Sequence, residues 1–191
     1  MKKSLVAFVT ISLLGIMIFG TTVLAAGEDF GARGASLQES YSLEEMLKYA
    51  VQDEYLARSE YQKIMDTFGT QRPFSNIIKS EEQHISLLKP LFEVYDIELP
   101  EDTANDYVII PASINEALET GVQAEIANIA MYEKFLKQEL PVDVRSVFER
   151  LKNASENHLR AFKNGVDRED GSRGNNQGQG KWRQGRIQSG G

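Results

Sequence analysis

Residues 42–69 read SLEEMLKYAVQDEYLARSEYQKIMDTFG. Mostly apolar residues recur in this stretch at steps of three and four. They are Leu43, Leu47, Ala50, Ala57, Tyr61, Ile64 and Phe68, with Glu54 as the one charged member. This period places all of them on one face of an α-helix and predicts a long amphipathic helix. Ser42, with Glu45 three residues later, has the signature of a capping box at the helix start, and Gly69 is a suitable stop.

The same period returns three times further along the chain. The second stripe follows Pro73 and consists of Phe74, Ile77, Glu81, His84, Leu88, Leu91 and Tyr95. The third follows a Ser113 cap and consists of Ile114, Ala117, Gly121, Glu125, Asn128, Tyr132 and Phe135. The fourth begins near Val142 and contains Val144, Phe148, Leu151, Ser155, His158 and Phe162. Pro90 is expected to kink the second helix or to end its regular part.

The connections between these helices predict their topology. Short segments join the first helix to the second and the third to the fourth, whereas residues 96–112, with Pro100 and Pro111, form a long crossover without helical period. This pattern predicts an all-α fold, an antiparallel four-helix bundle made of two hairpins. The hairpins also resemble each other, because Glu54 precedes Tyr61 by seven residues and Glu125 precedes Tyr132 by seven.

The two ends of the chain differ in composition from its middle. Residues 1–25 have the basic start, apolar run and small cleavage-site residues of a signal peptide, which predicts a secreted or cell-envelope protein. A membrane anchor is the alternative, since the apolar run approaches the length of a span. Residues 26–41 are assigned to a linker, 42–164 to the bundle, and the Gly/Gln/Arg-rich residues 165–191 to a disordered tail.

Charge is unevenly distributed along the chain. The net charge is -7, and the chain has no cysteine, so disulfides cannot stabilise it. Residues 167–191 carry five basic and three acidic side chains, which leaves the preceding domain strongly acidic. An acidic bundle is not expected to bind nucleic acid, whereas the basic tail is suited to contact an anionic polymer.

Five ionisable residues interrupt the apolar stripes, although such stripes face the core of a helix bundle. They are Glu54, Glu81, His84, Glu125 and His158. A buried carboxylate is costly unless a partner compensates its charge, and a bound metal cation is the partner that this set indicates. Glu81 and His84 are three residues apart, so one helix face presents both to one ion. Carboxylate and imidazole ligands suit iron, manganese or zinc.

Three runs of sequence carry a resemblance to a known family. Residues 54–61 (EYLARSEY), 80–84 (SEEQH) and 155–162 (SENHLRAF) resemble the ferritin-like, rubrerythrin-related carboxylate proteins, and in particular the bacterial family called domain of unknown function 2202. The resemblance covers residues 42–164 and implies a ferritin-like fold that holds a pair of iron or manganese ions. It also implies ligand roles: terminal ligands Glu54 and Glu125, a bridging Glu81, and imidazole ligands His84 and His158.

One position departs from that pattern. Ser155 stands where the superfamily has its second bridging glutamate, and Glu156 points roughly 100° away around the helix. A hydroxyl is a poor ligand. Three outcomes therefore remain open: two ions bound more weakly with a water or hydroxide between them, a single ion, or no metal.

Further residues are candidates for supporting roles around the ligands. Tyr61 and Tyr132 are placed either to hydrogen-bond Glu54 and Glu125 or to serve in redox chemistry, and Asn128 is placed to donate to a ligand carboxylate. Two functions follow from these observations. The first is an exported metal-binding protein that is either redox-active, with iron or manganese and dioxygen or peroxide as partners, or limited to metal binding and sequestration. The second is a non-catalytic helical-bundle interaction module of the cell envelope.

Overall fold

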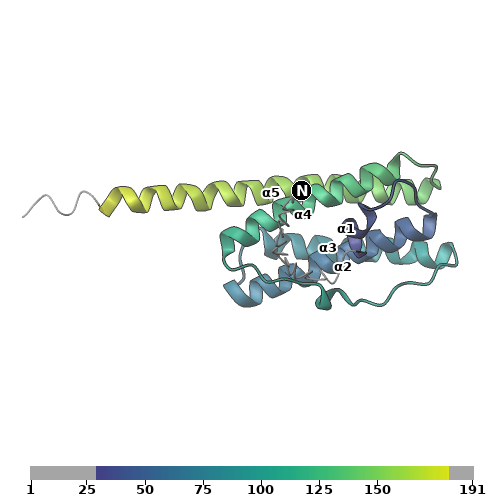
Figure 1. Ribbon diagram of the computed structural model, residues 1–191, viewed down its shortest axis with the longest axis horizontal. Helices are drawn as coiled ribbons and strands as arrows, with labels where there is room; N and C mark the ends of the chain where they lie inside the picture. Colours follow the sequence, from purple (N-terminus) through teal and green to yellow (C-terminus); the bar gives the residue numbers. More distant parts are fainter. Residues whose placement is uncertain (1–28, 181–191) are drawn as a thin grey trace, which may run out of the picture.

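The structure of the protein is a computed structural model that describes residues 29–180, with side chains described as far as residue 171. Within that range the chain is all-helical and has no strand (Figure 1). The elements are α1 (Gly31–Ala35), α2 (Leu43–Phe68), α3 (Phe74–Val94), η1 (Ala104–Asp106), α4 (Ile114–Leu136) and α5 (Val142–Gly180). The all-α prediction and the four long predicted helices are therefore confirmed.

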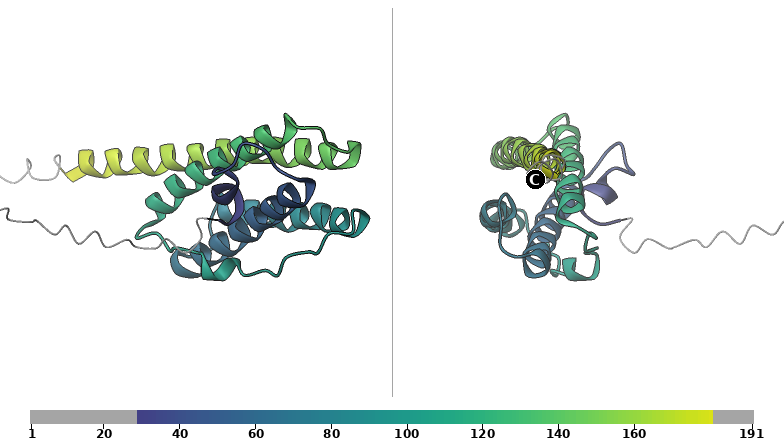
Figure 2. Two further views of the ribbon diagram at one scale, coloured as in Figure 1. Left: turned by 45° about the vertical axis from the view of Figure 1, so that its right-hand side comes forward. Right: turned by 90° about the vertical axis from the view of Figure 1, so that its left-hand side faces the viewer.

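The four long helices pack in two pairs. α2 packs along α3 and α4 along α5, and further contacts join α2 to α4 and α3 to α5. Two turned views show the same arrangement (Figure 2). Between α3 and α4 the chain runs back along the length of the helices, and η1 is its only helical turn (Figure 1). The predicted long crossover is thus present.

The helix ends follow the capping residues read from the sequence. Ser42 Oγ accepts the Glu45 N–H at 3.2 Å while Glu45 Oε2 accepts the Ser42 N–H at 2.7 Å, a complete capping box. Ser113 Oγ likewise accepts the Glu116 N–H. Pro90 does not end α3, which continues to Val94. Pro90 lies on the exposed face, where solvent can hydrogen-bond the carbonyl left without its helical donor.

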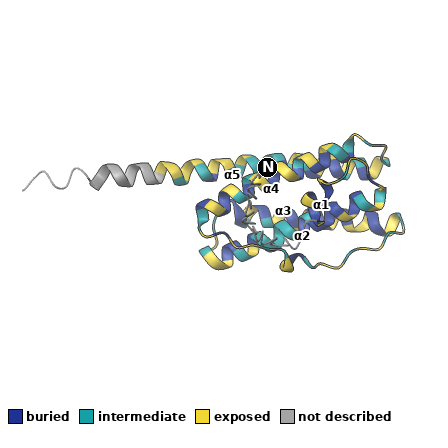
Figure 3. Cartoon of the chain, viewed as in Figure 1, coloured by how far each residue is buried: buried dark blue, intermediate teal, exposed yellow. Residues whose placement is uncertain are grey.

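A polar layer divides the core into two apolar clusters. One cluster contains residues from Met46 to Tyr55 of α2 together with the end of α3, whereas the other contains Tyr61, Phe74 and Phe162. In α3, α4 and α5 buried polar residues separate the segments that contribute to the two clusters, namely Glu81, His84, Glu125, Asn128, Ser155 and His158. In α2, Glu54 lies at the edge of the segment that contributes to the first cluster. The colouring by burial shows the helix faces that point inward (Figure 3). The polar residues of the stripes are therefore enclosed on both sides by apolar packing.

The prediction that residues 26–41 form a linker is wrong for the described part of that segment. α1 packs on α2 and α4, and Phe30, Ala32, Ala35 and Tyr41 are buried. Gly31 adopts φ +56°, which favours glycine, and the N–H of Ala32 donates to Asp53 Oδ1 at 2.8 Å. These contacts hold the segment against α2 and α4, because its apolar residues belong to the first apolar cluster.

The predicted disordered tail also differs from the structure, which continues α5 through residues 165–180. Gly165 is buried beside Leu118, and Val166 packs against the second cluster. Beyond these residues α5 projects past the other helices (Figure 1). Helical hydrogen bonds are local and this segment has no proline, so the helix continues without a core.

Two further predictions concern the ends of the chain, which the structure does not describe. The signal peptide, residues 1–25, and the end of the tail, residues 181–191, lie outside the described residues. Among the residues described, no helix is both long enough and apolar enough to span a membrane.

Candidate metal centre

The five ionisable stripe residues meet in the polar layer. α2 contributes Glu54, α3 contributes Glu81 and His84, α4 contributes Glu125, and α5 contributes His158. All five are buried, and the most exposed of them, His158, retains 8% of its accessible surface. The helical period predicted this placement, because each residue occupies an inward position near the middle of its helix.

Glu81 lies at the centre of the group. Its Oε2 is 2.8 Å from His84 Nδ1, which is also 3.0 Å from Glu54 Oε2. Its Oε1 is 3.2 Å from His158 Nδ1, which is also 3.4 Å from Glu125 Oε1. The two oxygens of one carboxylate thus face two different imidazoles, whose ring centroids are 5.7 Å apart.

The group therefore consists of two triads that share Glu81. One contains Glu54, Glu81 and His84, and the other contains Glu81, Glu125 and His158; within each triad one ligand atom per residue lies within 4.8 Å of the others. The oxygen-to-nitrogen distances suit one ion per triad. Two ligand atoms each about 2.1 Å from an ion and at right angles to each other lie about 3.0 Å apart.

Two tyrosine hydroxyls connect the halves of the layer, because each donates to a glutamate on another helix. Tyr61 of α2 donates to Glu125 Oε1 of α4 at 3.2 Å, and Tyr132 of α4 donates to Glu54 Oε1 of α2 at 2.9 Å. The glutamates that the sequence analysis named are thus the acceptors, each on the opposite helix. This exchange fixes the outer carboxylates, and Ser80 lies 3.2 Å from the second ring nitrogen of His84.

Asn128 and Ser155 form a network with a residue that the sequence analysis missed. Asn128 donates its amide to Asp53 Oδ2 instead of to any of the five, and Ser155 Oγ donates to Asn128 Oδ1 at 2.6 Å. Asp53 lies outside the apolar stripe of α2, and its other partner is Ala32, 21 residues away. No local sequence signal identifies such a residue.

A small cavity is lined by this network together with the carboxylates. Its volume is about 20 Å³, close to the space that one water molecule occupies. It is lined by Asp53, Glu54, Ala57, Tyr61, Glu81, Ala124, Glu125, Asn128 and Ser155. The cavity therefore lies on the side of the layer where a glutamate at position 155 would project.

Burial and hydrogen bonding shift the pKa values in the layer. Burial, with the nearby Glu81 charge, raises the pKa of Glu54 to about 8, and burial also raises that of Glu125. For Glu81 burial is outweighed by hydrogen bonds from His158 and His84, so its pKa falls to about 2. Burial opposes charge on the histidines, but their glutamate partners raise the pKa of His84 to about 10 and of His158 to about 9. The metal-free layer thus binds protons at neutral pH.

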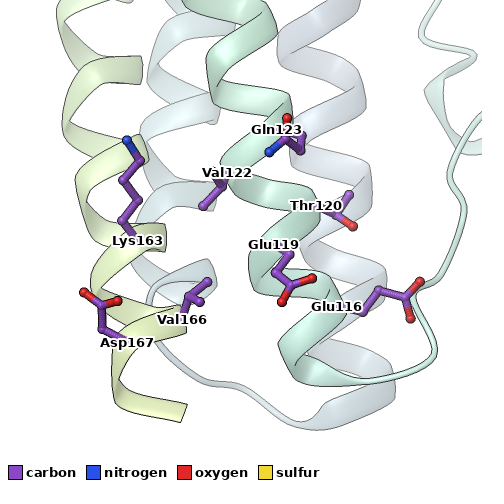
Figure 4. Close-up of a pocket in the computed structure, with 8 residues that line it drawn as sticks. All are labelled: Glu116, Glu119, Thr120, Val122, Gln123, Lys163, Val166 and Asp167. Carbon is purple, nitrogen blue, oxygen red and sulfur yellow. The ribbon is translucent and has the colours of Figure 1, made fainter. Parts of the chain in front are cut away.

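A larger groove lies away from the layer, between α4 and α5 (Figure 4). Its volume is about 690 Å³, and its walls include Val122 and Val166 with Glu119, Lys163 and Asp167 around them. None of the five layer residues lines it. Among the described residues, the groups of three or more close metal-ligating side chains lie in the polar layer and not in this groove.

Known proteins match more than half of this chain. A family described as an uncharacterized protein domain, DUF2202, matches residues 44–179, which include all five layer residues. The uncharacterized protein MJ0754 of Methanocaldococcus jannaschii is 30% identical over 128 residues, which cover 58% of this chain and 68% of that protein. The crystal structure of hypothetical protein MJ0754 superposes with a TM-score of 0.60 at 27% identity, over 70% of this chain and 85% of the other.

Proposed function

The chain belongs to the DUF2202 family, and we propose that it is a metal-binding protein whose long helices form an antiparallel four-helix bundle of the ferritin-like kind. The observation that carries this proposal is the position of Glu81, with one carboxylate oxygen facing each imidazole. A carboxylate shared between two buried Glu/His triads is suited to hold two adjacent cations. The proposed ligands are Glu54, Glu81, His84, Glu125 and His158.

The donor set indicates the class of metal. Three carboxylates and two imidazoles, with no thiolate, suit iron or manganese, and zinc fits the same donors. Iron or manganese would supply one-electron exchange with dioxygen or peroxide. The protein's own contribution is to hold the carboxylates by Tyr61 and Tyr132 and to exclude bulk water through the two apolar clusters.

Metal binding to this layer must displace protons, which gives a pH dependence. His84 and His158 are protonated in the metal-free site below their pKa values of about 10 and 9, and a bound cation needs both nitrogens free. We expect the affinity for Mn²⁺ to rise with pH from 6 to 8, by up to about tenfold per pH unit for each proton displaced. Competition titrations at several pH values measure this, and a pH-independent affinity would place the bound ion elsewhere.

The same shifts set the stability of the metal-free protein. A histidine whose folded pKa lies above its ordinary value stabilises the fold at low pH, and this contribution is lost as the pH rises through the folded value. The metal-free form is therefore expected to lose stability progressively between about pH 6.5, the ordinary histidine value, and pH 10. Denaturant melts across this range, with and without Mn²⁺, give the comparison; the loaded form should lose much less.

A non-catalytic interaction module is the second candidate. In the described part of the chain every buried side-chain nitrogen or oxygen has a hydrogen-bond partner without any ion. A polar layer whose hydrogen bonds are all made internally can serve only to fix how the helices align with one another, without binding a metal. Repeated failure to take up iron or manganese would favour this function.

We also propose that the protein is exported. The proposal rests on residues 1–25, in which Lys2 and Lys3 precede the apolar run and Val23 and Ala25 provide small residues for cleavage. N-terminal sequencing of the protein from its native cell is expected to begin at Ala26. A mature chain that still begins at Met1 would favour the membrane anchor.

A further inference from the structure

Asp53 is anchored between two donors that lie on different elements. Its Oδ1 accepts the N–H of Ala32 at 2.8 Å, and its Oδ2 accepts the side-chain amide of Asn128. Both oxygens therefore act as acceptors. Asp53 belongs to neither ligand triad, so its position calls for a different role.

This anchoring sets the direction of the hydrogen bonds that follow. Because Asn128 turns its nitrogen toward Asp53, its Oδ1 faces Ser155 and can only accept. The Ser155 hydroxyl donates to that oxygen at 2.6 Å and also lies 3.2 Å from the Leu151 carbonyl. Its single hydrogen is thus directed away from the cavity, and what Ser155 offers to the cavity is an oxygen lone pair.

The other polar walls of the cavity come from the carboxylate layer. Glu54, Glu81, Glu125 and Tyr61 also line it, and the Tyr61 hydroxyl donates its hydrogen to Glu125. A volume of about 20 Å³ admits one water-sized molecule. A molecule that hydrogen-bonds to the lone pair of Ser155 must bring its own hydrogen, which an aprotic anion lacks.

We propose that this cavity is a binding site for a single proton-bearing oxygen ligand, water or hydroxide, which Ser155 holds and which Asp53 positions through Asn128. This inference rests on the proposed metal centre, because the role given to the ligand is to bind the metal ions. A ligand that donates its hydrogens to these walls keeps its lone pairs for cations. The site therefore replaces, with one small ligand, the carboxylate that a glutamate at position 155 would provide.

A double-mutant cycle with Mn²⁺ as the probe tests the coupling. Ser155→Ala removes the acceptor, and Asp53→Asn removes the anchor that orients Asn128. Each variant is expected to weaken Mn²⁺ binding about 10- to 100-fold, as for other groups that orient ligands. If the residues act as one unit, the double variant should bind no more weakly than the weaker single variant. Single effects that multiply, or no effect, would overturn the proposal.

Matched controls separate this role from general destabilisation. Asp66→Asn alters another α2 aspartate that accepts a side-chain amide, and Ser86→Ala alters another helical serine that donates to a backbone carbonyl. Both control residues are exposed, and both controls should bind Mn²⁺ within about twofold of the unmodified protein. An equal loss of affinity in the controls would remove the cavity from the explanation.

A high-resolution crystal structure supplies a readout that does not depend on metal affinity. One ordered oxygen is expected in the cavity within hydrogen-bond distance of Ser155 Oγ, and it should disappear or move in Ser155→Ala and in Asp53→Asn. A dry cavity in the unmodified protein, or an unmoved oxygen in both variants, would overturn the inference. If the oxygen is present but Mn²⁺ does not bind, the metal proposal fails while the water site stands.

Discussion

Replacement of Glu81 by Gln is expected to abolish the stabilisation of the protein by iron or manganese. For the unmodified protein, metal at a hundredfold excess over its Kd should add about 2.7 kcal/mol to the free energy of unfolding. Glu81 is the residue shared by both triads. An amide offers one oxygen and turns an N–H toward the second imidazole, so the variant should show almost no metal-induced rise in Tm.

The same variant should also weaken the metal-free protein. Glu81 is buried against two histidines whose pKa values lie well above neutrality, and removing one partner of a buried pair typically costs about 3–5 kcal/mol. Glu82→Gln is the matched control, because Glu82 is the next residue of α3 and is exposed. A normal metal response in the Glu81 variant would remove this residue from the metal site.

Ser155→Glu is expected to increase the difference in stability between the metal-free and metal-loaded forms. The new side chain would extend toward the cavity as a fourth buried acid, which costs several kcal/mol without a cation. With metal, the added carboxylate should raise the affinity for Fe²⁺ or Mn²⁺, so that the full metal content is reached at a lower metal concentration. Thermal melts under anaerobic conditions, with and without the ion, measure both effects alongside metal counting.

The control for this variant is Ser86→Glu, which adds the same charge to an exposed position of α3. It should change neither metal content nor the difference between the two melts. If Ser155→Glu destabilises both forms equally and gains no metal, residue 155 does not face a metal centre. The account with two ions would then give way to the structural interaction module.

The long helices and the convergence of the layer could be predicted because both depend on local periodicity. Each of the five layer residues occupies a stripe position, and Ser42 and Ser113 mark helix starts through contacts made within one turn. Residues that share inward positions at similar depth in four packed helices must come together. The convergence of these five residues could therefore be predicted from the sequence without any long-range information.

Contacts between distant segments could not be read in this way. α1 has only five residues and no period, so its packing against the core depends on partners such as Asp53, 21 residues from Ala32. The tyrosines illustrate the same limit, because spacing places Tyr61 beneath Glu54 along α2 but does not reveal that its hydroxyl reaches Glu125. Which helix faces which is decided by tertiary packing.

Anomalous diffraction from crystals grown with Mn²⁺ or, anaerobically, with Fe²⁺ tests the central claim most directly. The account predicts two anomalous peaks about 4 Å apart in the polar layer, one within each triad, with a Glu81 oxygen bound to each. A single peak that retains Glu81 as a ligand would reduce the centre to one ion. No peak among Glu54, Glu81, His84, Glu125 and His158 after reconstitution would contradict the account.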